Sequence, residues 1–136
     1  MKAKTIFIID TSDSDKIFLV LFKEGFLLNQ KCIDSENRAT DKLIGKIDNF
    51  LTGNNLGIKD IDLIGAVLGP GSYTGLKIGL TIANTLAWAL NIPVAGMNKK
   101  EFDSYQDLAE KLEDQNDNNK FEHIIEPYYD RAAYYE

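Results

Sequence analysis

Apolar residues change their spacing several times along the chain, and each change predicts a new secondary-structure element. The first part holds three short and nearly continuous apolar runs, which are typical of buried strands. These runs are Thr5–Ile9, Lys16–Phe22 and Phe26–Ile33. Only Thr11–Asp15 and Lys23–Gly25 separate them. Connections this short predict an antiparallel meander of three strands.

The middle of the chain alternates helical and strand-like patterns. Arg38–Thr52 and Ser72–Asn91 repeat apolar residues at helical spacing, and the strand-like run Asp60–Leu68 lies between them. Pro93–Gly96 predicts a short fifth strand, because a helix usually stops before proline. Lys99–Leu112 predicts an amphipathic helix. Strand–helix–strand units imply right-handed parallel crossovers, so we expect an α/β fold whose mixed five-stranded sheet is flanked by helices.

The end of the chain is more polar. Glu113–Lys120 is rich in asparagine and predicts a loop, and residues 123–136 predict a terminal hairpin. At 136 residues the chain is long enough for one domain with a real core, which we place at residues 1–122.

A glycine-rich segment, Gly69–Gly79, joins the fourth predicted strand to the second predicted helix. One interpretation is an anion site, in which Gly71 and Ser72 at the start of the helix hold a phosphate. The other is close packing, because small residues recur every four positions along the helix. They are Gly75, Gly79, Ala83 and Ala87. The segment lacks a P-loop ending and a dinucleotide fingerprint, so we favour packing.

Asp10 and Thr11 follow the first strand and are weak candidates for contacting Mg²⁺ or phosphate. Both residue types are also common in turns, and this second interpretation is favoured. His123 is the only histidine, so no zinc-type site is expected. Cys32 lies in a predicted strand and is interpreted as a core residue rather than a nucleophile.

Composition narrows the functional classes. The net charge of −6 excludes broad binding to nucleic-acid backbone by this chain alone. No apolar run is long enough to span a bilayer. A single cysteine cannot form an internal disulfide, which fits a reducing compartment. We therefore expect a soluble cytoplasmic protein.

The predicted helix Ser72–Asn91 is unusually apolar. Its apolar and small residues cover an arc of about 200°, whereas a surface helix needs little more than about 100°. Trp88 stands among the polar residues of the remaining face. Either the helix is enclosed within its own fold, or another chain covers part of it. Both interpretations stay open on the pattern alone.

The segment Gly69–Gly79, the run Thr81–Leu90 that follows it and Ile92-Pro93-Val94 resemble the bacterial TsaB (YeaZ) family. The first strand, ending in Ile9–Ser12, and Tyr129-Asp130-Arg131 near the end resemble the family as well. The family belongs to the machinery that makes threonylcarbamoyladenosine at position 37 of tRNA. The resemblance implies an actin/Hsp70-like (ASKHA, ribonuclease H-like) lobe. Family members usually continue into a second lobe, so residues 123–136 would be the remnant of its start.

The resemblance also implies a function without catalysis. TsaB proteins are scaffold subunits that dock onto their paralogue TsaD, which performs the threonylcarbamoyl transfer, and the ATPase TsaE joins the pair. No cofactor and no metal are implied for this chain, since Ala39-Thr40-Asp41 stands where a histidine is common. Contact with tRNA would be indirect. Alternatives are a degenerate nucleotide-binding fragment using Asp10, Thr11, Gly71 and Ser72, or a homodimer without TsaD.

Docking onto TsaD would use the two helices of the first lobe, which correspond here to Arg38–Thr52 and Ser72–Asn91. The expected interface residues are Leu43, Ile47, Phe50, Ile78, Ile82, Thr85, Leu86, Trp88 and Ala89.

Overall fold

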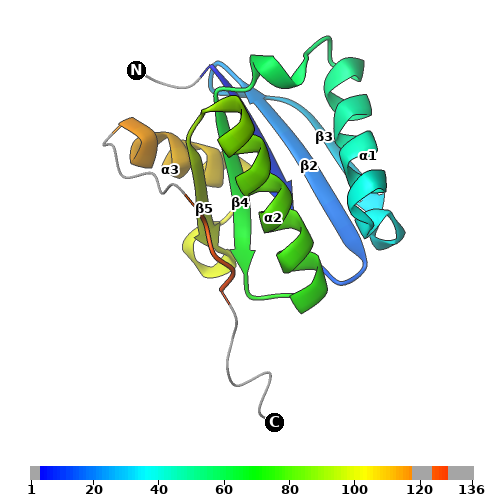
Figure 1. Cartoon of the computed structure of the whole chain (residues 1–136). Helices are drawn as coiled ribbons and strands as arrows, with labels where there is room; N and C mark the ends of the chain where they lie inside the picture. The colour runs from blue at the N-terminus through cyan, green and yellow to red at the C-terminus, as the bar shows by residue number, and fades with distance from the viewer. Residues whose placement is uncertain (1–3, 118–123, 129–136) are drawn as a thin grey trace.

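The computed structural model describes residues 4–117 and 124–128. Within them, one sheet carries its five strands in the order β3-β2-β1-β4-β5 (Figure 1). The strands are β1 (Thr5–Asp10), β2 (Lys16–Lys23), β3 (Phe26–Asp34), β4 (Leu63–Gly69) and β5 (Val94–Asn98). The first three form an antiparallel meander, while β4 runs parallel to both β1 and β5. The α/β class is confirmed.

Three α-helices cover the two faces of this sheet (Figure 1). They are α1 (Thr40–Gly53), α2 (Tyr73–Leu90) and α3 (Tyr105–Asp117), with short 3-10 turns at Ser35–Arg38, Ile58–Asp60 and Lys99–Glu101. The alternation of β1 separates two cores. Phe7 and Ile9 pack with α1 and α2, whereas Ile6 and Ile8 pack with α3. A strand covered on both faces reads as a continuous apolar run, which is why β1 shows no polar alternation.

The last helix differs from its prediction. Lys99–Glu101 is a separate 3-10 turn, and α3 begins only at Tyr105. Ser104 Oγ accepts a hydrogen bond from Asp107 N at 3.1 Å, so this serine marks the helix start. At the other end, the predicted loop from Glu113 is wrong as far as Asp117, where α3 ends. Leu112 is buried against the sheet, and Glu113 and Gln115 beyond it are good helix formers.

Cys32 is exposed, so its interpretation as a core residue is wrong. It lies on β3, an edge strand of which only Ile33 is buried. An apolar run alone does not reveal that a strand will lie at the edge of a sheet with both faces largely uncovered. Of the predicted hairpin, only Ile124–Tyr128 is described, and it contains no strand. His123 and Tyr129–Arg131 lie outside the described residues.

Candidate functional site

Asp10 ends β1 at the edge of the sheet where the parallel strands have their carboxyl ends. Its carboxylate is buried and accepts three hydrogen bonds. Oδ1 accepts from Ser12 N at 3.0 Å and from Ser12 Oγ at 2.5 Å. Oδ2 accepts from the hydroxyl of Tyr105 at 2.6 Å. Both oxygens of this weak candidate for cation binding therefore accept hydrogen bonds from within the chain.

Tyr105 reaches this carboxylate from α3, which is 95 positions further along the chain. Its ring also lies 6.1 Å from the ring of Phe18 on β2, centroid to centroid. Burial raises the pKa of the Tyr105 hydroxyl well above its usual range, and the charge of Asp10 and the hydrogen bond to it raise this pKa further. The phenol therefore keeps its proton and remains a donor. The sequence placed Tyr105 on an apolar helix face and gave no signal for this partner.

The glycine-rich turn packs against the segment that follows Asp10. A side chain at Gly71 would collide with the carbonyl oxygen of Ser12, and one at Gly75 with that of Thr11. At Gly79 it would meet the Thr11 side chain itself. The two weak candidate pairs, Asp10 with Thr11 and Gly71 with Ser72, are thus brought together, but each fills the space beside the other.

Backbone donors at the start of α2 are also used internally. Ser72 N donates to the carbonyl of Ser12 at 2.9 Å, and Ser72 Oγ accepts from Gly75 N at 3.3 Å. A helix start binds phosphate through free N–H groups, and these two groups are taken. The geometry supports the packing interpretation of the turn.

A hollow of about 340 Å³ remains beside Asp10. Besides that carboxylate, it is lined by Lys99, Phe102, Asp103, Ser104 and Tyr105. At the end of the neighbouring strand β5, Asn98 Oδ1 is buried and has no hydrogen-bond partner. Across residues 4–117 and 124–128, no group of three or more His, Cys, Asp or Glu side chains is placed to hold a metal ion.

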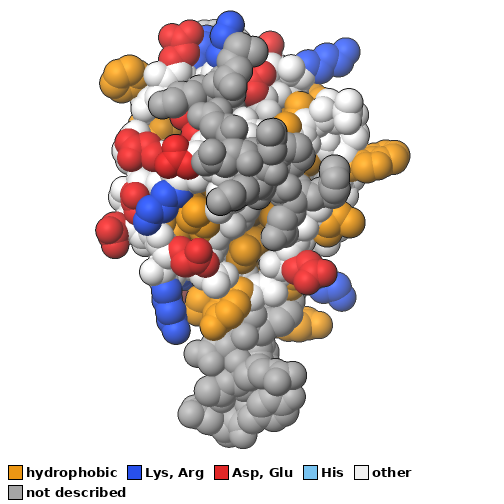
Figure 2. Space-filling model, turned by 90° about the vertical axis from the view of Figure 1, so that its left-hand side faces the viewer, with side chains coloured by type: hydrophobic (Ala, Val, Ile, Leu, Met, Phe, Trp, Pro, Cys, Tyr) orange, Lys and Arg blue, Asp and Glu red, His pale blue; other side chains and the backbone are white. Residues whose placement is uncertain are grey.

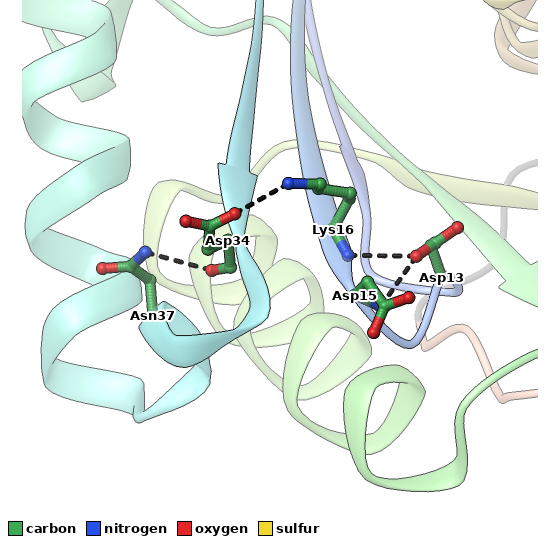
Figure 3. Close-up of polar contacts among 5 residues, drawn as sticks. All are labelled: Asp13, Asp15, Lys16, Asp34 and Asn37. Atoms are coloured by element: carbon green, nitrogen blue, oxygen red, sulfur yellow. Dashed lines mark hydrogen bonds and ion pairs between the residues drawn. The ribbon is translucent and has the colours of Figure 1, made fainter.

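The β1–β2 turn and the end of β3 form an exposed polar cluster (Figure 3). Asp13 Oδ1 accepts from the backbone N–H groups of Asp15 at 2.7 Å and Lys16 at 3.0 Å, and these bonds lower the pKa of Asp13. Lys16 Nζ lies 2.8 Å from Asp34 Oδ1, which raises the pKa of the lysine and lowers that of the aspartate. Asn37 Nδ2 donates to the Asp34 carbonyl at 3.0 Å. These bonds hold the β1–β2 turn and the end of β3 in place.

The predicted interface residues separate into two groups. Four of them are buried in the core between the sheet and the helices: Leu43, Ile47, Phe50 and Ile82. Ile78 and Leu86 are half-buried, while Thr85, Trp88 and Ala89 are exposed. The pattern showed which positions are apolar, but not which side of each helix the sheet covers.

A groove of about 360 Å³ lies beside α1 and α2. Its lining residues are Asp41, Ile44, Gly45, Ile47, Asp48, Ile58 and Leu86. Ile44 is 48% exposed and was absent from the predicted set. Trp88, also on α2, is 85% exposed, which is the largest exposed fraction among the exposed large hydrophobic side chains of the described residues. We call Ile44, Thr85, Leu86, Trp88 and Ala89, together with this groove, the α1–α2 face.

The opposite side of the molecule has a different character. Figure 2 views the molecule from the side of α3, where acidic side chains are spread widely and hydrophobic ones form separate patches. Helix α3 itself carries five acidic residues and one lysine: Asp107, Glu110, Glu113, Asp114, Asp117 and Lys111. No helix in the described part of the chain is long and apolar enough to cross a membrane.

Comparisons with known proteins place the chain among proteins of tRNA threonylcarbamoyladenosine biosynthesis. The family model described as "TsaD: tRNA N6-adenosine threonylcarbamoyltransferase" matches residues 35–117. The protein named tRNA threonylcarbamoyladenosine biosynthesis protein TsaB is 31% identical over 97 residues in Bacillus subtilis and 30% identical over 95 residues in Haemophilus influenzae. These alignments cover 71% and 69% of this chain, which spans only 42% and 39% of the length of the two relatives.

The solved structure titled "YeaZ from Pseudomonas aeruginosa" superposes with a TM-score of 0.62 at 24% identity. The superposition covers 70% of this chain and 44% of that one, and it shows that the two share a fold.

Proposed function

Since the chain belongs to the TsaB (YeaZ) family of tRNA threonylcarbamoyladenosine biosynthesis proteins, we propose that it is a non-catalytic scaffold subunit that docks onto a TsaD-type paralogue. In this role it supports threonylcarbamoyl transfer to adenosine 37 of tRNA. A TsaE-type ATPase joins the pair, and tRNA is contacted through the cytoplasmic complex rather than by this chain. The acidic net charge of −6 supports that last point.

The observation that carries the docking proposal is the groove beside α1 and α2, together with the exposure of Trp88 on the outer side of α2. Tryptophan is among the residues that contribute most binding energy in protein interfaces. An isolated exposed side chain needs no explanation, but here it accompanies Ile44, Leu86 and Ala89 on two neighbouring helices. A partner that fills the groove would cover Ile44 and Leu86, and a contact that extends over the outer side of α2 would also bury the indole.

The non-catalytic part of the proposal is supported by the state of Asp10. Hydrogen bonds from within the chain compete with a cation or a water molecule for the lone pairs of a carboxylate. Here Ser12 and Tyr105 supply donors to both oxygens. The segment Thr11–Ser12 fills the space next to the glycine-rich turn.

Size-exclusion chromatography of the full chain with its cognate TsaD tests docking. We expect co-elution at micromolar concentration, and Trp88→Ala should weaken the complex by a factor of about 30 or more, as for other interface tryptophans. Ile44→Asp should abolish it, because the substitution places a charge in the groove. Phe26→Ala is the matched control, since Phe26 is 77% exposed on β3 and does not line the groove.

Two results would count against the proposal: no co-elution of the unmodified chain, or equal effects of Trp88→Ala and Phe26→Ala. If the chain instead forms a dimer with itself that Ile44→Asp disrupts, the α1–α2 face serves self-association. Ile82→Asp, which the helix pattern alone would suggest, is unsuitable because Ile82 is buried and the variant would unfold. Leu86 is only half-buried, so Leu86→Asp is a usable second probe.

The hollow beside Asp10 and the unpartnered Asn98 Oδ1 favour a second candidate function, residual nucleotide binding. Isothermal titration with Mg-ATP distinguishes the two candidates. Saturable binding that Asp10→Asn removes would support a degenerate nucleotide site. The scaffold proposal expects no such heat.

A further inference from the structure

The segment Ile124–Tyr128 is fastened to α2 by one side chain. Asn84 Nδ2 donates to the carbonyl of Ile125 at 2.9 Å, and Asn84 Oδ1 accepts from Ile125 N at 2.9 Å. A single carboxamide thus satisfies both backbone groups of a residue 41 positions away. Asparagine and glutamine are the side chains that carry a carbonyl acceptor and an NH₂ donor on one planar group.

A second fastening lies three residues further on. Tyr128 N donates to the carbonyl of Leu68 on β4 at 2.7 Å. The next residue of β4, Gly69, has φ +121°, and a side chain at this position would collide with the carbonyl oxygen of Tyr128. Glycine is therefore needed here both for the backbone conformation and for the close approach of the segment.

Between the two fastenings the segment contributes an apolar anchor. Ile125 is only 3% exposed and belongs to the core cluster that contains Ala83 and Ala87 of α2. Its neighbour Ile124 and the terminal Tyr128 are exposed. The segment is therefore held by main-chain hydrogen bonds at Ile125 and Tyr128 and by one buried side chain, and none of its other side chains is buried.

We propose that Asn84 is a main-chain clamp that closes Ile124–Tyr128 as a strap over α2 and the end of β4, and that the strap opens in a local transition distinct from unfolding of the lobe. Opening withdraws the Ile125 side chain from the core and breaks the hydrogen bond from Tyr128 N to the Leu68 carbonyl. Short segments held by few contacts open at lower free energy than the strands of the core. The proposal does not depend on docking to a partner, because neither Asn84 nor Ile125 belongs to the α1–α2 face.

Amide hydrogen exchange of the full chain, followed by NMR, measures strap opening directly. Asn84→Ala removes both hydrogen bonds to Ile125. It should accelerate amide exchange at Ile125 and Tyr128 by about tenfold, which corresponds to the net contribution of roughly one hydrogen bond. Amides in β1 and β2 should keep their protection, since the backbone hydrogen bonds of these strands run within the sheet.

Asn84→Asp should make amide protection of the strap depend on pH, which is not expected if Asn84 only fills space. It keeps the acceptor for Ile125 N but turns the donor into an oxygen that faces the Ile125 carbonyl. Above the carboxyl pKa of about 4, two oxygens oppose each other and the strap should open. Below it, the protonated acid can donate, and protection relative to the unmodified chain should recover. Asn49→Asp, the same change at an exposed position of α1, is the control and should show no such recovery.

The clamp is overturned if Asn84→Ala and Asn84→Asp leave exchange at Ile125 and Tyr128 within about twofold of the unmodified chain. It is also overturned if β1 and β2 lose protection together with the strap, because opening would then be global unfolding. Loss confined to residues 124–128, with recovery at low pH for Asn84→Asp, establishes it.

Discussion

The carboxyl edge of the sheet and the α1–α2 face differ in how completely each satisfies its own groups. The edge contains the residues that suggest chemistry, yet Asp10 is bonded to Ser12 and Tyr105, and the glycine-rich turn is filled by Thr11 and Ser12. The face consists of ordinary helix residues, yet it leaves Trp88 and a groove uncovered. Residue type indicates what a site could do, and the unsatisfied groups indicate where a ligand or partner can gain binding energy.

Both outcomes follow from the cost of burial. A buried carboxylate must be hydrogen-bonded, and at this edge Ser12 and Tyr105 supply the donors to Asp10. Exposed apolar surface has no such internal solution, and burial by another chain is the way to remove it from water. An edge closed in this way and a face left open are what a subunit that docks without catalysing requires.

The largest expected effect tests whether the turn is a packed elbow. Gly75→Ala should destabilise the fold by about 1–3 kcal/mol, because its methyl group meets the carbonyl oxygen of Thr11, a backbone atom that cannot rotate away. This cost exceeds the helix-propensity gain of alanine, which is at most about 1 kcal/mol. Urea denaturation monitored by circular dichroism gives the difference.

Gly45→Ala is the matched control for that substitution. Gly45 lies inside α1, and a Cβ there meets nothing within 4 Å. Alanine should therefore stabilise the fold by about 0.5–1 kcal/mol. If Gly75→Ala is as stabilising as Gly45→Ala, the turn has room beside it, and the anion-binding interpretation regains support.

A smaller effect is expected from Tyr105→Phe, which removes one donor from Asp10. Because the pKa of Tyr105 is raised in the folded state, its contribution to stability is complete below the unfolded pKa of about 10 and decreases as the pH rises above that value. The slope of this loss is at most about 1.4 kcal/mol per pH unit. Tyr105→Phe should lower stability by about 1 kcal/mol at pH 7, and the difference from the unmodified chain should shrink between pH 10 and 11.

Parallel stability curves at every pH would contradict this reason for the Tyr105 effect. In that case Tyr105 stabilises the fold through packing against Phe18 rather than through its hydrogen bond to Asp10.

How much the sequence predicts depends on the range of the interactions involved. Local patterns predicted all five strands and the existence of the three helices. They missed the start of α3. The apolar spacing continues back to Lys99, whereas the helix begins after Ser104, whose hydroxyl accepts a hydrogen bond from Asp107 N. Periodicity found apolar helix faces but not the direction of the sheet, so Ile82 was expected at an interface and Ile44 was not. The contacts of Asp10 with Tyr105 and of Asn84 with Ile125 join positions far apart, and no local pattern encodes them.

The smallest effect is expected at the exposed polar cluster, where the hydrogen bonds measure 2.7–3.0 Å but water competes for them. Lys16 and Asp34 keep 48% and 66% of their side-chain surfaces exposed. The lowered pKa of Asp34 and the raised pKa of Lys16 confine any contribution of the pair to the interval between about pH 4 and pH 10, with loss on either side. Exposed pairs of this kind are weakened by salt and by side-chain entropy. Lys16→Met should therefore leave the urea midpoint at pH 7 unchanged within error. A clear decrease in the urea midpoint that disappears at 1 M salt would contradict this. It would show that the attraction between Lys16 and Asp34 stabilises the exposed polar cluster in addition to its backbone hydrogen bonds.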